Sequence, residues 1–349
     1  MYTKVLPYLK YAPTVALFAG FVLDVFTLNK PDALFENTVI LGYLFLSALV
    51  MIILQARPAD AGENRRLLLL SILQFAFGNL AGALLVLYAR SGTLAGSAIF
   101  IGILVLLFLG NETLRDRYAR TQLRIIIWFT LLLTYCTLVV PVFLGSIGTF
   151  AFLLSIGVAV VVTTALVFAL SKLAHGEFST HTRRIGISTA IVTIVFGALY
   201  FSNLIPPVPL SLKHIGIYHS LEVTDAGYAA TFEAPSWYEF WRDTSSVFGV
   251  ANDTSAYCFS SVYAPGKLKT EIRHRWERYD AEQKKWITIA RVPFSISGGR
   301  DEGFRGYSRT SQITAGKWRC SVETSRGVLI GRTTFNAVDE VYETTETQL

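Results

Sequence analysis

Residues 183–209 divide the chain into two parts of different character. An apolar run over residues 185–205 follows two arginines, and Pro206, Pro207 and Pro209 come directly after it. A helix that crosses a bilayer needs about 20 mostly apolar residues. The run therefore predicts a membrane-spanning helix, and it is the last one expected. Before it the chain is apolar in blocks of similar length, whereas after it the apolar residues come in short alternating runs.

The first part contains seven apolar blocks long enough to cross a membrane. The whole chain is 52% hydrophobic and only 16% charged, and its mean hydropathy of +0.45 is typical of integral membrane proteins. Short connectors favour a bundle of antiparallel neighbours. The first block lacks a small-residue cleavage site, which predicts an uncleaved helix. The expected spans are 13–28, 38–54, 67–88, 94–110, 123–144, 147–170 and 185–205.

The basic residues of the connectors predict the orientation. Twelve Lys and Arg fall on the side of the amino terminus, and only Lys30 and Arg90 fall on the other side. This bias predicts a cytoplasmic amino terminus, and an odd number of spans then places the carboxy-terminal part outside the cytoplasm. The number of spans is hardest to count in the nearly continuous apolar run 123–170. One helix more or fewer there would place the carboxy-terminal part on the other side of the membrane. The net charge is +7 over residues 1–213 and −1 over 214–349, so the basic excess indicates membrane topology and no nucleic-acid partner.

The second part alternates with a period of two, as strands do. We predict strands at 254–263, 268–278, 285–293, 317–324 and 328–338. One segment, 236–248, opposes this pattern because its aromatic residues fall at helical spacing. The predicted fold is therefore a membrane α-helical bundle of seven transmembrane helices over residues 1–212, followed by an all-β, immunoglobulin-like sandwich over residues 213–349.

Several short motifs of the second part are distinctive: His-Arg-Trp at 274–276, Gly-Tyr-Ser at 306–308, Gly-Lys-Trp-Arg at 316–319, and Gly-Val-Leu at 327–329 with Phe335. Together they resemble the domain of unknown function 2914, a bacterial family. The apolar part, with Asp-Val-Phe-Thr-Leu at 24–28, looks like the multi-pass membrane proteins that carry this domain at their carboxy terminus. The resemblance implies this architecture and the bacterial cytoplasmic membrane, and it implies no activity, ligand or catalytic residue. Cys320 departs from the pattern, which usually has an aliphatic residue there.

Two cysteines and a tryptophan have the spacing of an immunoglobulin-type sandwich. Cys258, Trp276 and Cys320 follow the order Cys, Trp, Cys, and Trp318 stands two residues before the second cysteine. A disulfide between Cys258 and Cys320 would persist outside the cytoplasm. The alternative is two buried free thiols on separate strands.

Polar residues within the apolar blocks are the second group of candidates. Asp24 is the one ionised side chain well inside a block, and a carboxylate at that depth costs on the order of 3 kcal/mol on insertion scales. It is a candidate intramembrane polar site, or it simply reaches water at its helix end. The residues that would extend such a site, or make interhelical hydrogen bonds instead, are Glu36, Asn37, Gln74 and Asn79.

A third group combines aromatic faces with hydrogen-bond donors, which suits a sugar or an acidic ligand. Alternation puts His274 and Trp276 on one face of a strand and Arg275 on the other, so core packing of both tryptophans is the competing interpretation. The candidate binding residues are His274, Arg275, Trp276, Arg300, Arg305 and Trp318.

The sequence contains no phosphate-binding loop, nucleophile elbow, zincin motif or Cys-x-x-Cys pair. We therefore expect no cofactor or metal and no catalytic residue. The first hypothesis is a non-enzymatic membrane anchor or sensor whose exported sandwich binds an envelope protein or glycan. The second is a small transporter or membrane-embedded enzyme with a polar site around Asp24. The oligomeric state does not follow from the sequence.

Overall fold

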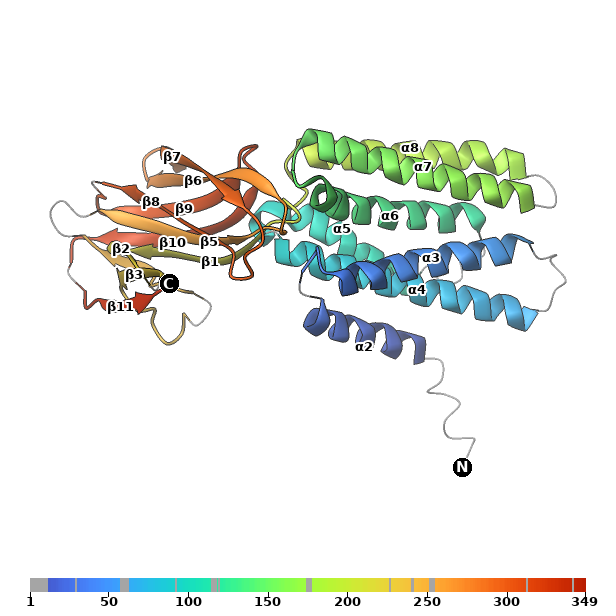
Figure 1. Ribbon diagram of the computed structural model, residues 1–349, viewed down its shortest axis with the longest axis horizontal. Helices are drawn as coiled ribbons and strands as arrows, with labels where there is room; N and C mark the ends of the chain where they lie inside the picture. The colour runs from blue at the N-terminus through green and yellow to red at the C-terminus, as the bar shows by residue number, and fades with distance from the viewer. Residues whose placement is uncertain are drawn as a thin grey trace, which may run out of the picture. The chain divides into compact units, whose positions relative to one another are not determined.

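The computed structural model describes residues 12–28, 30–56, 63–91, 93–113, 118, 120–173, 178–225, 227–239, 242–250, 255–311, 313–340 and 342–349. Within these residues, seven helices precede eleven strands (Figure 1). The chain divides into two compact units between Ile205 and Pro206, with residues 91–96 grouped with the second. The predicted order of a helical part and a β-rich part is confirmed.

Each expected apolar block contains one helix. The helices are α2 (Ala12–Thr27), α3 (Leu34–Ala56), α4 (Glu63–Ser91), α5 (Leu94–Thr113), α6 (Thr121–Leu144), α7 (Thr149–Leu173) and α8 (Phe178–Phe201). Among the described residues, five helices are long and apolar enough to cross a membrane: α3, α4, α6, α7 and α8. The apolar stretch of α5, Gly96–Asn111, is shorter, and α2 has 16 residues.

The apolar run 123–170 holds two helices because α6 ends at a glycine. Gly145 adopts a left-handed conformation with φ +64°, which glycine tolerates without a steric penalty. Its N–H donates to the Val142 carbonyl at 3.3 Å, and the N–H of Ser146 donates to the Pro141 carbonyl at 3.3 Å. These bonds close the carboxy-terminal turn of α6, and α7 then begins at Thr149.

Helix α6 is the central helix of the first unit. Nearly all of its residues from Arg124 to Pro141 are buried, and it packs against α3, α7 and α8. Polar bonds tie it to other helices: Trp128 Nε1 donates to the Leu44 carbonyl at 3.1 Å, and the Tyr88 hydroxyl donates to the Thr134 carbonyl at 2.9 Å. Such bonds satisfy polar groups in an apolar interior.

The second unit contains the strands. They are β1 (Ser211–Tyr218), β2 (Ser220–Thr224), β3 (Gly227–Phe232), β4 (Val247–Gly249), β5 (Ala256–Tyr263), β6 (Lys269–Asp280), β7 (Lys285–Ser297), β8 (Phe304–Thr310), β9 (Gly316–Thr324), β10 (Leu329–Val338) and β11 (Thr345–Gln348). They form three sheets, with orders β1-β5-β8, β4-β10-β9-β6-β7 and β11-β3-β2.

The core of this unit is built from the first two sheets. Strand β5 contributes Cys258, while β6 and β9 of the five-stranded sheet contribute Trp276 and Cys320. Phe248 and Phe335, from β4 and β10, complete the aromatic part of the same cluster. Period-two alternation explains why each strand gives every second side chain to this core.

The helical spacing of residues 236–248 does not produce a helix in the described part of that segment. Residues 236–239 form a turn, in which the N–H of Glu239 donates to the Ser236 carbonyl at 2.7 Å, and Val247 begins strand β4. Trp237 is 90% exposed, so its side chain cannot anchor a buried helix face. Phe240 and Trp241 lie outside the described residues.

Candidate functional site

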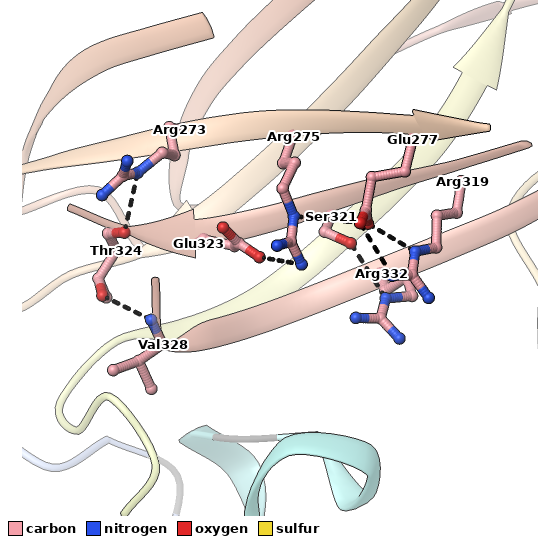
Figure 2. Close-up of polar contacts among 9 residues, drawn as sticks. All are labelled: Arg273, Arg275, Glu277, Arg319, Ser321, Glu323, Thr324, Val328 and Arg332. Carbon is pink, nitrogen blue, oxygen red and sulfur yellow. Dashed lines mark hydrogen bonds and ion pairs between the residues drawn. The ribbon is translucent and has the colours of Figure 1, made fainter. Parts of the chain in front are cut away.

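One face of the five-stranded sheet carries charged side chains, and two of them, Glu277 and Glu323, are buried. Because side chains alternate along a strand, the residues between the core positions of β6 and β9 point away from the core. Strand β10, which pairs with β9, adds a third row. Figure 2 shows the set: Arg273, Arg275, Glu277, Arg319, Ser321, Glu323, Thr324 and Arg332.

Two buried glutamates organise this face. Glu277 accepts a bidentate pair of bonds from Arg319, Nε to Oε2 at 2.5 Å and Nη2 to Oε1 at 2.9 Å. Glu323 is paired with Nη2 of Arg275 at 2.6 Å, and Nε of Arg275 lies 3.4 Å from Oε2 of Glu277. Both carboxylates belong to side chains that are 3% exposed. Buried charges of this kind hold their partners in fixed positions.

Three further arginines leave positive charge unneutralised. Arg273 donates Nε to the Thr324 carbonyl at 3.2 Å, and Arg332 donates Nε to the Ser321 hydroxyl at 3.0 Å. No described residue accepts a bond from their terminal nitrogens. Exposed Arg291 of β7 lies opposite Arg275 in the strand register.

The face therefore has five arginines around two buried carboxylates, and exposed Glu271, two residues before Arg273 on the same side of β6, adds a third carboxylate. Positive charge is still in excess within the cluster. Burial, and then the neighbouring charge of Arg319, lower the pKa of Arg332. Burial also raises the pKa of Glu323, and this effect exceeds the opposing one of Arg275. Unused guanidinium donors beside excess positive charge can bind carboxylate, sulfate or phosphate groups. We call the five arginines with Glu277 and Glu323 the arginine face.

The six binding residues expected from the sequence do not share one surface. His274, Trp276 and Trp318 are buried on the core side of the sheet, whereas Arg275 belongs to the arginine face. Two others are elsewhere. Exposed Arg300 lies over the ring of Phe304, 5.4 Å from its centroid, and Arg305 donates to the carbonyl of Leu349 at 3.1 Å.

His274 belongs to a buried polar network. Its Nε2 lies 2.7 Å from the Ser260 hydroxyl, and its Nδ1 lies 2.9 Å from the Ser308 hydroxyl. Trp276 Nε1 donates to the same Ser308 oxygen at 2.9 Å. Burial lowers the pKa of His274 to about 3, so the ring is neutral. Both ring nitrogens are occupied by structural bonds.

Cys258 and Cys320 are joined in a disulfide that links β5 to β9. Their sulfurs and a ring nitrogen of His274 lie within 4.8 Å of one another, which is close enough for a metal site. In the oxidised protein both sulfurs are already bonded to each other and the histidine is bonded to serines. This trio is therefore part of the core.

The polar residues of the helical unit have separate partners. Asn37 accepts a bond from the Tyr135 hydroxyl at 2.8 Å, and Asn79 donates to the Phe75 carbonyl at 2.8 Å. Oδ2 of Asp24 is buried without a hydrogen-bond partner among the described residues. Neither amide is bonded to Asp24.

Glu36 and Gln74 complete that group. Glu36 Oε1 accepts from the backbone N–H of Lys30 at 3.4 Å, so it serves the start of its own helix. The backbone carbonyl of Gln74 accepts from Asn111 Nδ2 at 3.0 Å, which joins α4 to α5.

Most of the arginine face was missed in the sequence, although a signal was present. The patterns Arg-x-Arg-x-Glu at 273–277 and Arg-x-Ser-x-Glu at 319–323 put charges at every second position of two strands. That alternation places them on one face. The sequence does not show that β6 and β9 are neighbouring strands, which places Glu277 opposite Arg319.

Residues 269–337 match the model of the family described as Protein of unknown function (DUF2914). A search of curated proteins finds no match. One solved structure that matches the chain is the Pseudomonas fluorescens alkylpurine DNA glycosylase AlkC bound to DNA containing an abasic site analog. The match has 12% sequence identity and a TM-score of 0.20, and it covers 86% of this chain and 98% of that chain. A TM-score that low carries no argument about fold or function. The similarity to the DUF2914 family thus covers residues 269–337, within the β-rich part of the chain.

Proposed function

We propose that this chain is a non-enzymatic anchor or sensor of the bacterial cytoplasmic membrane whose exported β domain binds an anionic ligand. The ligand is an envelope protein or glycan that displays carboxylate or phosphate groups, and it binds on the arginine face. The observation that carries the proposal is the excess of arginines around two buried glutamates on one sheet face.

The physical reason lies in preorganisation. A guanidinium group offers several donors in a planar fork that matches carboxylate and phosphate oxygens. Glu277 and Glu323 fix Arg319 and Arg275, so little side-chain entropy is lost when a ligand binds. The terminal nitrogens of Arg273 and Arg332 then supply donors beside a rigid platform.

The membrane setting has separate support. The charge bias of the connectors favours a β domain outside the cytoplasm. The apolar helices, five of which among the described residues are long and apolar enough to cross a membrane, favour a membrane location. The disulfide between Cys258 and Cys320 persists in oxidising compartments. Its packing against Trp276 favours an immunoglobulin-like arrangement of the two larger sheets.

A polyanion-binding measurement tests the proposal. The full-length protein in detergent is applied to immobilised polygalacturonate, and the salt concentration that elutes it is recorded. We expect Arg273→Gln and Arg332→Gln to elute at lower salt than the wild type, because each removes a charge that contacts the anion. The matched control is Arg309→Gln, which removes the same charge from β8 of another sheet.

The same column experiment also defines the outcomes that would contradict the proposal. If both variants and the control elute at the same lower salt concentration, retention depends on net charge alone. If all four proteins elute together, none of these arginines contacts the anion. In either case the arginine face would lose its assigned role. Retention lost only in Arg309→Gln would move the ligand to the β1-β5-β8 sheet.

One observation favours a second candidate function, a small transporter or membrane-embedded enzyme. The buried Oδ2 of Asp24 has no partner among the described residues, as expected of a carboxylate that meets a ligand within the bilayer. Asp24→Asn separates the two functions. An anchor keeps its cellular function with this substitution, whereas a transporter loses it at unchanged protein level.

A further inference from the structure

A second cationic site lies at the start of α6 and is independent of the arginine face. Arg124 sits in the first turn of this helix and is 6% exposed. Its Nη2 donates to the Thr121 hydroxyl at 2.6 Å, so the guanidinium group points back toward the helix start. Its Nε is buried and has no hydrogen-bond partner among the described residues.

Among the described residues, no acidic side chain compensates the charge of Arg124. In the described part of the chain no carboxylate forms an ion pair with it, and the nearby charge that acts on it is that of another arginine, Arg66 of α4. A buried charge without a partner is costly, so native proteins pair such charges or coordinate them. Two arginines of like charge make the missing partner an anion.

The backbone points to the same conclusion. The first N–H groups of a helix lack intrahelical acceptors and carry the positive end of the helix dipole. The N-cap residue of α6, Arg120, has an extended backbone and makes no side-chain capping bond. The hydroxyl of Thr121, the first residue of the helix, accepts the bond from Arg124. A helix start of this kind binds phosphate and similar anions.

We propose that Arg124, Arg66 and the amino-terminal turn of α6 form a binding site for a phosphate group. Arg124 contributes an oriented donor from the buried side, the first-turn N–H groups contribute donors from the helix, and Arg66 contributes charge. The basic connectors predict that this end of α6 faces the cytoplasm. The phosphate is therefore carried by an anionic lipid headgroup of the inner leaflet or by a free phosphate compound.

Thermal unfolding of the full-length protein in detergent distinguishes these two sources. One arm adds inorganic phosphate, with chloride at equal ionic strength as its reference. The other adds phosphatidylglycerol, with phosphatidylcholine as its reference. A ligand that binds only the folded state raises the Tm. A rise in the phosphate arm alone identifies a free phosphate compound, and a rise in the phosphatidylglycerol arm alone identifies the lipid; either result supports the site.

Three variants connect the rise to the site. Arg124→Gln and Arg66→Gln should each need at least about tenfold more probe for a half-maximal rise, because a charge-assisted bond or a charge is lost. Arg65→Gln, which makes the same charge change one residue away, should respond like the wild type. Arg66 is exposed, so Arg66→Gln should fold even if the buried substitution Arg124→Gln prevents folding.

Three results would overturn the proposal. The first is that neither probe raises the Tm of the wild type. The second is that Arg66→Gln and Arg124→Gln respond to the probes at the same concentrations as the wild type and Arg65→Gln. In the probe-free protein, Arg124→Gln should unfold at the same or a higher Tm than the wild type, since it removes an unpaired buried charge; a lower Tm there would assign Arg124 a purely structural role.

Discussion

Burial affects individual ionisable residues of this chain in three different ways. His274 avoids the cost of a buried charge by staying neutral between two serine hydroxyls. Arg124 cannot lose its charge at physiological pH, so its cost must be met by another group. Glu277 and Arg319 represent the third solution, a buried pair with bidentate geometry. Residues of similar burial thus have different consequences, depending on whether they titrate and on what they touch.

The neutral state of His274 predicts a pH dependence of stability. Its folded pKa of about 3 lies below the ordinary value of about 6.5, so the unfolded state binds a proton that the folded state excludes. Stability is then lost as the pH falls from about 6.5 toward 3, by up to about 1.4 kcal/mol per pH unit. Denaturant unfolding at several pH values measures this slope, and His274→Gln should reduce it by the contribution of one bound proton. An unchanged slope in the variant would assign the pH dependence to the carboxylates.

At the scale of elements, the alternating strands were predictable and the segments between them were not. The strands β5, β6, β9 and β10 begin and end within two residues of the predicted ranges. The strands of residues 211–232 were missed because their apolar and polar residues alternate weakly. The aromatic residues at 236–248 suggested a helix, but periodicity alone does not say whether a face is buried, and Trp237 is exposed.

The arginine face shows the same limit. Alternation along β6 fixes that Arg275 and Glu277 share a face. Burial of Glu277, however, depends on Arg319, 42 residues further along the chain. That pairing follows from sheet order, which local sequence does not encode.

The two larger sheets of the β-rich unit are covalently joined, which predicts a stability effect. Cys258 and Cys320 are separated by 62 residues, and closing a loop of that length stabilises a fold by about 4 kcal/mol in the chain-entropy model. The double substitution Cys258→Ala with Cys320→Ala should lower the free energy of unfolding by about that amount. Tryptophan fluorescence during denaturant unfolding reports it, because Trp276 pairs with Cys320 in the strand register.

Cys136 provides the control for that measurement. It is a free, buried cysteine of α6, so Cys136→Ala should leave the unfolding of the β-rich unit unchanged. Equal stability of the wild type and the double variant under oxidising conditions would mean that the disulfide contributes nothing to the fold.

The topology of the whole molecule determines which compartment meets each cationic site. Under the proposed topology, the arginine face would meet envelope ligands and the start of α6 would meet cytoplasmic phosphates. The break at Gly145 agrees with this proposal because it makes 123–170 two helices, and seven helices precede the strands in the described part of the chain. Inverting the molecule would exchange both sets of ligands and place the disulfide in a reducing compartment.

Labelling of single cysteines in intact cells decides between these orientations. Arg120 and Gln283 are both exposed. Each of Arg120→Cys and Gln283→Cys is made in a Cys136→Ala background, with the disulfide left in place. We expect a membrane-impermeant reagent to label position 283 in intact cells and position 120 only after permeabilisation, because the twelve basic residues are retained on the cytoplasmic side. The reverse pattern would place the arginine face in the cytoplasm, and its ligand would then be sought among cytoplasmic anions.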